Sequence, residues 1–124
     1  MSSRILLIED NEQNRYLARF LLESRGHKVD TAADGPSGIE LAKTLGAAVI
    51  ILDIQLPNLD GYATARELRK IPALQDTPII AVTSYAMVGD REKALAAGCD
   101  GYLEKPIDPV TFVPDIERFL RGKS

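Results

Sequence analysis

The sequence contains one cysteine, one histidine and no tryptophan. Because a disulfide needs two thiols, Cys99 cannot close one within the chain, and a zinc site built on cysteines is excluded too. We therefore expect structural roles for Cys99 and His27. Long apolar runs are also missing: the stretch at residues 5–8 ends at Glu9, which leaves neither the apolar region of a signal peptide nor a membrane span. A cytoplasmic protein is the expectation.

Runs of basic residues are absent as well. The formal net charge is -3, and a protein that follows a nucleic-acid backbone needs clustered cations. Direct nucleic-acid binding is therefore not expected. The length of 124 residues, with 45% hydrophobic and 27% charged residues, is typical of one globular domain. Residues 1–124 are predicted to form a single domain, with no effector domain.

Short apolar segments alternate with longer segments of helical periodicity. This pattern predicts repeated βαβ units and a parallel sheet, and thus an α/β fold. The runs at 5–8, 49–52 and 79–82 are apolar throughout, as strands covered on both faces are, whereas 28–32 alternates and suits an edge strand. The predicted strands cover 5–8, 28–32, 48–52, 79–82 and 101–103.

The segments between these strands predict helices that cover the sheet. Gly26 and Gly98 stand where a helix C-terminus needs a left-handed residue. Helical spacing marks an inward face in the first helix, part of the second, and the last helix. These residues are Leu17, Phe20, Leu21 and Ser24, then Ile39 and Ala42, and finally Phe112, Ile116, Phe119 and Leu120, with further helices expected at 62–70 and 89–97.

Polar side chains follow four of the predicted strands. In a sheet with right-handed crossovers the carboxyl ends of the strands share one edge, where ligands bind. The first strand ends in Glu9-Asp10, the third in Asp53, the fourth in Thr83-Ser84, and the fifth in Glu104-Lys105-Pro106. Three carboxylates, a hydroxyl and an ammonium group are therefore predicted to lie together.

Three neighbouring carboxylates repel one another unless a cation lies between them. Oxygen ligands without histidine or cysteine favour Mg²⁺, or Mn²⁺, and Mg²⁺ in proteins commonly shares its shell with phosphate oxygens. Asp53 can then attack phosphorus while Lys105 and Thr83 hold the phosphoryl oxygens. Each residue alone would more often be a helix cap, a loop charge or strand filler; their joint appearance at successive strand ends favours the site.

The sequence resembles the receiver domain of two-component response regulators over essentially its whole length. The resemblance implies a flavodoxin-like fold of strand order 2-1-3-4-5 with helices on both faces of the sheet. It implies that Asp53 is the phosphoacceptor, that Asp10 and Asp53 bind Mg²⁺ with Glu9 acting through water, and that the Gln55 carbonyl completes the ligands. The matching stretches are residues 5–11, 51–61, 78–83 and 102–106.

The same resemblance implies a switch. Thr83 moves toward the phosphoryl group and Tyr102 turns inward, which changes the face formed by the fourth helix, fifth strand and fifth helix. Gln55 and Tyr85 flank the phosphoryl group, and the Lys105-Pro106 bond is expected to be cis. Many members of this family have two aspartates at the positions of Glu9 and Asp10. The glutamate has a longer side chain but the same negative charge, so the function is expected to be retained.

The expected partners are a histidine kinase or a histidine phosphotransfer protein and a downstream protein target, with a monomer or weak homodimer as the oligomeric state. The chain is expected to act as a phosphoacceptor switch rather than an enzyme. Tyr16, Leu17 and Phe20 resemble the surface that docks the phosphodonor, although Leu17 and Phe20 are expected to lie mostly in the core. The pattern is most similar to stand-alone receivers of the cell-division regulator type and to receivers of hybrid histidine kinases.

Three other functions fit the residues less well. A phosphoaspartate phosphatase of the haloacid-dehalogenase type needs Asp-x-Asp, whereas Asp53 is followed by Ile54-Gln55. A flavin-binding module would place a phosphate beside Glu9-Asp10, which repel it, and the sequence has no G-x-G-x-x-G or P-loop motif. A receiver that works without phosphorylation is disfavoured because every expected chemical residue is present.

Overall fold

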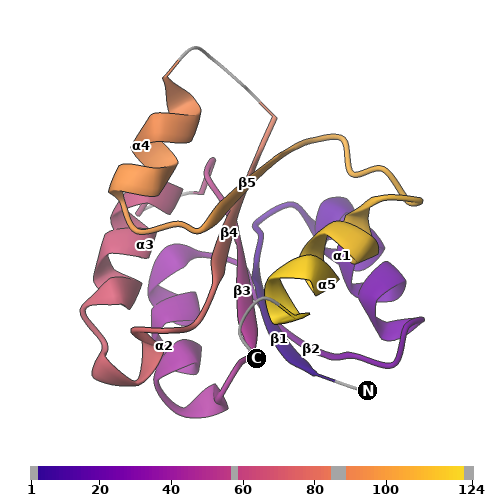
Figure 1. Cartoon of the computed structure of the whole chain (residues 1–124), viewed down its shortest axis with the longest axis horizontal. Helices are drawn as coiled ribbons and strands as arrows, with labels where there is room; N and C mark the ends of the chain where they lie inside the picture. Colours follow the sequence, from indigo (N-terminus) through magenta and orange to yellow (C-terminus); the bar gives the residue numbers. More distant parts are fainter. Residues whose placement is uncertain (1–2, 57–58, 85–88, 122–124) are drawn as a thin grey trace.

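The centre of the protein is a sheet of five parallel strands in the order β2-β1-β3-β4-β5 (Figure 1). The computed structural model describes residues 3–56, 59–84 and 89–121. Strands and helices alternate along the chain, which confirms the predicted α/β fold and strand order. The elements are β1 (Arg4–Ile8), α1 (Glu12–Glu23), β2 (Lys28–Ala32), α2 (Gly35–Leu45), β3 (Val49–Asp53), α3 (Gly61–Arg69), the 3-10 turn η1 (Pro72–Leu74), β4 (Ile79–Thr83), α4 (Asp90–Ala96), β5 (Gly101–Glu104) and α5 (Phe112–Arg121).

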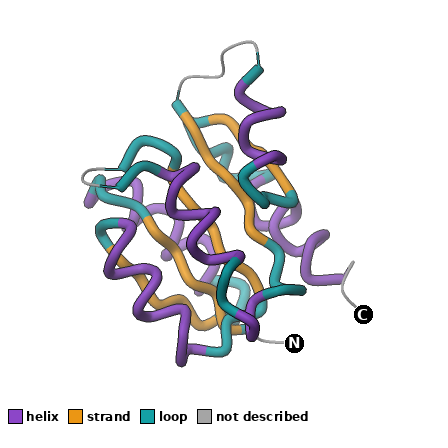
Figure 2. Tube along the Cα trace, turned by 90° about the vertical axis from the view of Figure 1, so that its left-hand side faces the viewer, coloured by secondary structure: helices purple, strands orange, loops and turns teal. Residues whose placement is uncertain are grey.

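Helices cover both faces of the sheet. α1 and α5 lie on one face, and α2, α3 and α4 lie on the other (Figure 1), so that in Figure 2 the strands run between helices. Successive side chains of a strand point to opposite faces. Ile5 and Leu7 of β1 accordingly join the core under α1 and α5, whereas Leu6 and Ile8 join the core under the other helices. This two-sided burial explains why the central strands are apolar throughout.

The predicted strands agree with the observed ones to within one residue. Asp53, Thr83 and Glu104 are the last residues of their strands rather than the first residues after them. β2 lies at the edge of the sheet, as its alternating pattern predicted. Gly26 and Gly98 both have positive φ, 88° and 108°, which confirms the left-handed positions expected after α1 and α4.

The predicted inward face of α1 is wrong in part. Its buried residues are Ala18 and Leu22, Leu17 is only half-buried, and Phe20 is 57% exposed. The prediction relied on the helical spacing of the large side chains at 17 and 20. The helix instead packs against the sheet through Ala18 and Leu22. Phe20 instead stacks on Tyr16, with ring centroids 6.3 Å apart. The prediction for α5 holds, because Phe112 and Ile116 are buried and Phe119 and Leu120 are partly buried against the same core.

His27 and Cys99 have structural surroundings, as expected. The His27 ring is buried, and its Nδ1 accepts a hydrogen bond from the Ser3 N–H, so Nε2 carries the proton in the neutral ring. Nε2 lies 2.8 Å from the Glu117 carboxylate and so links the start of β2 to α5. Burial raises the pKa of the Cys99 thiol to about 11, which keeps this cysteine unreactive at neutral pH.

The carboxyl ends of the strands share one edge of the sheet. Asp53 is paired with Val82 in the register of β3 and β4, and Thr83 is paired with Glu104 in that of β4 and β5. The Lys105-Pro106 peptide bond that follows β5 is cis, as predicted. Within the described ranges, no helix combines the length and the apolar character that crossing a membrane requires.

Candidate functional site

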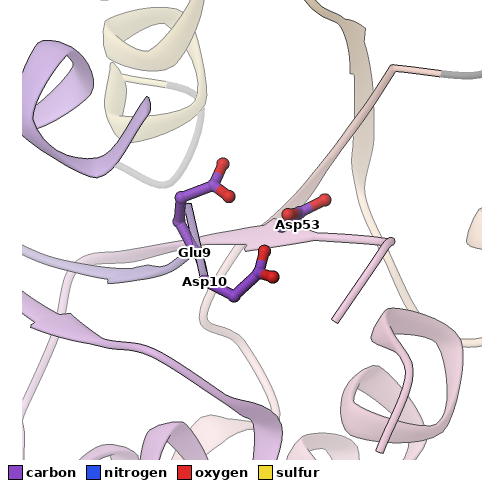
Figure 3. Close-up of side chains that lie close together, drawn as sticks. All are labelled: Glu9, Asp10 and Asp53. Atoms are coloured by element: carbon purple, nitrogen blue, oxygen red, sulfur yellow. The ribbon is translucent and has the colours of Figure 1, made fainter. Parts of the chain in front are cut away.

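Three carboxylates meet at the carboxyl edge of the sheet. Glu9 and Asp10 follow β1, and Asp53 ends β3, which is the next strand in the sheet; their side chains lie close together (Figure 3). One carboxylate oxygen from each lies within 4.8 Å of the others. Glu9 and Asp53 are buried, whereas Asp10 is exposed. The predicted convergence of acidic residues is therefore present, with solvent access on the side of Asp10.

Lys105 reaches into the same site from the loop after β5. Its Nζ lies 2.6 Å from Oε1 of Glu9 and 3.3 Å from Oδ2 of Asp53. All three side chains are at least nine-tenths buried, so water screens these interactions only weakly. The single ammonium group compensates one of three carboxylate charges and leaves two uncompensated among these four side chains.

The chain after β1 is shaped to present the acidic pair. The Asn11 N–H donates to Oε2 of Glu9, while the Asn11 side chain accepts from the Asn14 N–H and caps α1. Arg15, one turn into α1, donates to the carbonyl oxygens of Glu9 and Asp10. These bonds hold the backbone of the pair, so the two carboxylates project from a fixed turn.

Burial raises the pKa of the Asp53 carboxyl from 3.8 to about 6. Glu9 adds to the increase through a hydrogen bond and its negative charge. The Gln55 N–H, which donates to Oδ1 of Asp53 at 2.9 Å, and the positive charge of Lys105 lower the pKa. Asp53 is therefore mostly ionised above pH 6, and its negative charge is held in surroundings that favour a further cation.

Thr83 and Gln55 complete the inner part of the site. Thr83, at the end of β4, is buried, and its Oγ1 accepts a hydrogen bond of 2.5 Å from Nε2 of Gln55. The Ser84 N–H donates to Oε1 of the same carboxamide at 3.1 Å. Gln55 thus contacts Asp53 through its backbone and the end of β4 through its side chain.

Tyr102 lies on β5, beside Ala81 of β4. Its side chain is partly buried and packs against the core under α2, α3 and α4, and burial raises the pKa of its phenol. The hydroxyl oxygen is buried and has no hydrogen-bond partner among the residues that the structure describes. Tyr85, the other residue predicted to flank the site, lies outside the described residues.

The donor set suits a small divalent cation. Three carboxylates offer hard oxygen ligands, one of them at the solvent edge, and the described residues place no histidine or cysteine beside them. The two uncompensated charges match the charge of Mg²⁺ or Mn²⁺. The residues present therefore fit the metal that the sequence predicted, and the ammonium group of Lys105 and the hydroxyl of Thr83 lie at the same edge of the sheet.

Two contacts of the site were not expected from the sequence. Arg15 belongs to no basic run in the sequence, and only its place shortly after Asp10 indicates that it can reach the turn. Gln55 was expected to contribute its carbonyl oxygen and to flank the phosphoryl group, but the contact of its carboxamide with Thr83 was not foreseen. Side-chain contacts between different strand ends depend on the register of the sheet, which the sequence does not specify.

The sequence matches the model of the response regulator receiver domain over residues 5–117. This chain belongs to the response regulator receiver family. It is 35% identical over 120 residues to the polar-differentiation response regulator DivK of Brucella ovis, with 97% of this chain and 98% of that protein covered. The DivK protein of Brucella anthropi matches to the same extent. The chain is thus a receiver of the DivK type within two-component signalling.

Solved receiver structures superpose on almost the whole chain. The receiver domain of a sensor histidine kinase from Pseudomonas aeruginosa, which holds a magnesium ion in its active-site cleft, has a TM-score of 0.90 and 36% identity and covers 98% of this chain and 99% of its own. The chemotaxis protein CheY4 of Vibrio cholerae has a TM-score of 0.91 and 27% identity, with 96% and 99% covered. The chain therefore has the flavodoxin-like fold of receiver domains, as the sequence predicted.

Asp10 offers a direct test of the receiver's metal site. Replacing Asp10 with Asn should weaken Mg²⁺ binding at least about tenfold, the smallest loss usual for partners in a metal site. Because Asp10 is exposed, the free energy of unfolding without metal should change by less than about 0.5 kcal/mol. Amide chemical shifts recorded during a Mg²⁺ titration measure the affinity. Asp76→Asn, another exposed aspartate, is the matched control, and equal affinities in both variants would contradict the assignment.

Proposed function

We propose that this receiver is a phosphorylation switch in which Asp53 accepts a phosphoryl group from a histidine kinase or a histidine phosphotransfer protein. The proposal rests on one observation: a buried carboxylate at the carboxyl edge of the sheet lies beside an ammonium group and two further carboxylates. Such a carboxylate is held in place, is ionised at neutral pH and has a positive neighbour for the oxygens of an incoming phosphate. Residues 1–124 act as one receiver domain.

Mg²⁺, or Mn²⁺, would be held by Asp10, Asp53 and the Gln55 carbonyl oxygen, with Glu9 acting through water. When bound, the ion neutralises the carboxylates and the phosphate oxygens, which otherwise repel each other. The family resemblance and the donor set support this assignment. The magnesium ion in the receiver from Pseudomonas aeruginosa supports it further.

The covalent step uses Asp53 as the nucleophile. A carboxylate oxygen of Asp53 attacks phosphorus, the bond between phosphorus and the donor's histidine nitrogen breaks, and that nitrogen keeps the electron pair. Lys105 and Thr83 contact the phosphoryl oxygens, because phosphoryl transfer depends chiefly on positioning and charge neutralisation. The protein assists its own phosphorylation and dephosphorylation but is a switch rather than an enzyme.

The signal passes through Thr83 and Tyr102. A dianionic phosphoryl group on Asp53 attracts the Thr83 hydroxyl and biases an equilibrium between two conformations. The buried Tyr102 hydroxyl lacks a partner among the described residues, and such a group carries a desolvation cost of about 1–3 kcal/mol. A second position of the Tyr102 ring in which the hydroxyl finds a partner would remove this cost and would change the face of α4, β5 and α5.

Protein partners distinguish the phosphorylated from the unphosphorylated receiver. The stacked rings of Tyr16 and Phe20 are 71% and 57% exposed on α1, whose first residues follow Asp10. This placement supports α1 as the docking surface for the phosphodonor. The downstream target is a protein that binds one state of the switched face, and the receiver itself is a monomer or weak homodimer in the cytoplasm. As an alternative, the chain acts as the receiver of a hybrid histidine kinase, which is supported by its likeness to the receiver domain of a sensor histidine kinase from Pseudomonas aeruginosa.

Acetyl phosphate tests the proposed chemistry without a cognate kinase. Incubation with acetyl phosphate and Mg²⁺ should add one phosphoryl group to the intact protein, and mild base should remove it because acyl phosphates hydrolyse readily. Omitting Mg²⁺ and adding a chelator should prevent the addition. A base-stable adduct, or one that forms equally well without metal, would contradict the proposal.

A further inference from the structure

The Gln55 carboxamide makes two contacts that the proposed phosphoryl transfer does not use. Nε2 donates to Oγ1 of Thr83 and Oε1 accepts from the Ser84 N–H. The orientation of the carboxamide is fixed by its surroundings, since a backbone N–H can only donate and must therefore face Oε1. Thr83 consequently meets the NH₂ side of Gln55, and the hydroxyl oxygen acts as the acceptor.

Gln55 also bridges the two strand ends between which a phosphoryl group would lie. Its N–H donates to Oδ1 of Asp53 at the end of β3, while its side chain is held at the end of β4. Oε1 places an oxygen acceptor at the Ser84 N–H, next to the phosphoacceptor. A phosphoryl oxygen bound between Asp53 and β4 would compete with this carboxamide for the same donor and for the position of the Thr83 hydroxyl.

We propose that the Gln55 side chain is a latch that holds Thr83 and Ser84 in the unphosphorylated arrangement. This inference rests on the proposed function and makes Gln55 a positioning residue, beyond its expected carbonyl contact with the metal. When the Thr83 side chain turns toward a phosphoryl group on Asp53, its Oγ1 moves away from Nε2 of Gln55 and the bond between them is lost. The latch therefore opposes switching until the charge on Asp53 outweighs it.

The two hydrogen bonds of the Gln55 carboxamide set the size of the change expected when the side chain is replaced. One intramolecular hydrogen bond contributes roughly 1 kcal/mol net, which corresponds to about a fivefold change in an equilibrium. Removing the latch should therefore raise the population of the released Thr83 conformation at least about fivefold. Gln55→Met is the suitable change, because methionine keeps the length of the side chain but neither donates nor accepts comparably.

The first measurement uses the unphosphorylated, metal-free protein. In Gln55→Met the Ser84 amide proton should lose about fivefold of its protection against solvent exchange, and the Thr83 methyl resonance should shift. Gln75→Met is the matched control. The Gln75 carboxamide donates to the carbonyl oxygens of Arg69 and Ile71, at the C-terminal end of α3; the other end of α3, at Gly61, is the one that bonds to the chain after β3. Unchanged Ser84 protection and an unchanged Thr83 resonance in Gln55→Met would overturn the latch.

The second measurement is the rate of phosphorylation by acetyl phosphate at saturating Mg²⁺. Gln55→Met should react about fivefold faster than the unmodified protein, with the Gln75→Met rate unchanged. An equal or slower rate in Gln55→Met would overturn the latch. If the unmodified protein takes up no phosphoryl group, the proposed function fails instead, and the exchange measurement still decides whether Gln55 holds Ser84 and Thr83.

Discussion

Asp53→Asn is expected to take up no base-labile phosphoryl group from acetyl phosphate under conditions in which the unmodified receiver is fully phosphorylated. The carboxamide of asparagine keeps the shape of the side chain but lacks the anionic oxygen that we propose attacks phosphorus. It also removes one negative charge from the predicted metal site, so both the nucleophile and part of the Mg²⁺ binding are lost. Intact mass before and after mild base measures the result.

Asp76→Asn is the control for this experiment. Asp76 is exposed between η1 and the amino end of β4, whereas the site lies at the carboxyl ends of the strands, and its replacement should leave the added mass unchanged. Full phosphorylation of Asp53→Asn would show that another side chain is the acceptor. Loss of phosphorylation in Asp76→Asn as well would point to a general defect of the variants rather than to the site.

Lys105→Ala is expected to lower the free energy of unfolding by about 3 kcal/mol at pH 8 without divalent metal, as is usual when one partner of a buried ion pair is removed. The variant leaves Glu9 and Asp53 buried together without the ammonium group that lies 2.6 Å and 3.3 Å from them. Denaturant unfolding in the presence of a chelator measures the loss. Added Mg²⁺ should restore part of it, because the ion binds the same carboxylates.

The loss should depend on pH in a defined direction. The pKa of Asp53 is raised to about 6 in the folded protein, so folding favours its protonated form. The contribution of Asp53 to stability is fully present below pH 3.8 and decreases as the pH rises through 6. Removing Lys105 takes away a group that lowers this pKa, so the part of the destabilisation that comes from Asp53 should become smaller as the pH falls from 8 to 5.

Lys70→Ala provides a matched comparison for stability. Lys70 pairs with Glu67 at 2.8 Å, but both side chains are largely exposed, and such pairs contribute less than about 1 kcal/mol. Its replacement should cause a small loss that does not depend on metal. Equal losses for Lys70→Ala and Lys105→Ala at pH 8 would contradict the view that Lys105 neutralises the buried carboxylates.

Lys105→Ala should also separate phosphorylation from switching. The variant keeps Asp53 and should still be phosphorylated at saturating Mg²⁺ and acetyl phosphate. Without the ammonium group the phosphoryl oxygens are held less firmly, so the Tyr102 resonances should stay at their unphosphorylated positions. Tyr102 shifts like those of the phosphorylated unmodified protein would exclude this role for Lys105.

The sequence predicted the fold well because the decisive patterns are local. Strands such as 49–52 and 79–82 are buried on both faces, and this forces an uninterrupted apolar run that is easy to recognise. α1 was less well predicted, since its contact with the sheet uses Ala18 and Leu22 while the larger Phe20 faces outward. Size and periodicity alone do not tell which side of an amphipathic helix carries an exposed aromatic pair.

The sequence predicted which acidic residues meet at the candidate site, but it did not predict the contacts between their side chains and the neighbouring ones. Acidic residues at strand ends must meet at one edge once the sheet is parallel, which made Glu9, Asp10 and Asp53 evident. The contacts of Lys105 with two carboxylates, and of the Gln55 carboxamide with Thr83, depend on strand register and on rotamers. Those details arise only when separate strands are packed together.

Borohydride trapping tests the central claim most directly. Borohydride reduces an aspartyl phosphate to homoserine, and peptide mapping then identifies the modified position. After phosphorylation by acetyl phosphate and Mg²⁺, homoserine is expected at position 53 and at no other aspartate, with Asp10 and Asp60 unchanged. Homoserine at another position, or none in protein that has gained the mass of a phosphoryl group, would contradict the assignment of Asp53 as the phosphoacceptor.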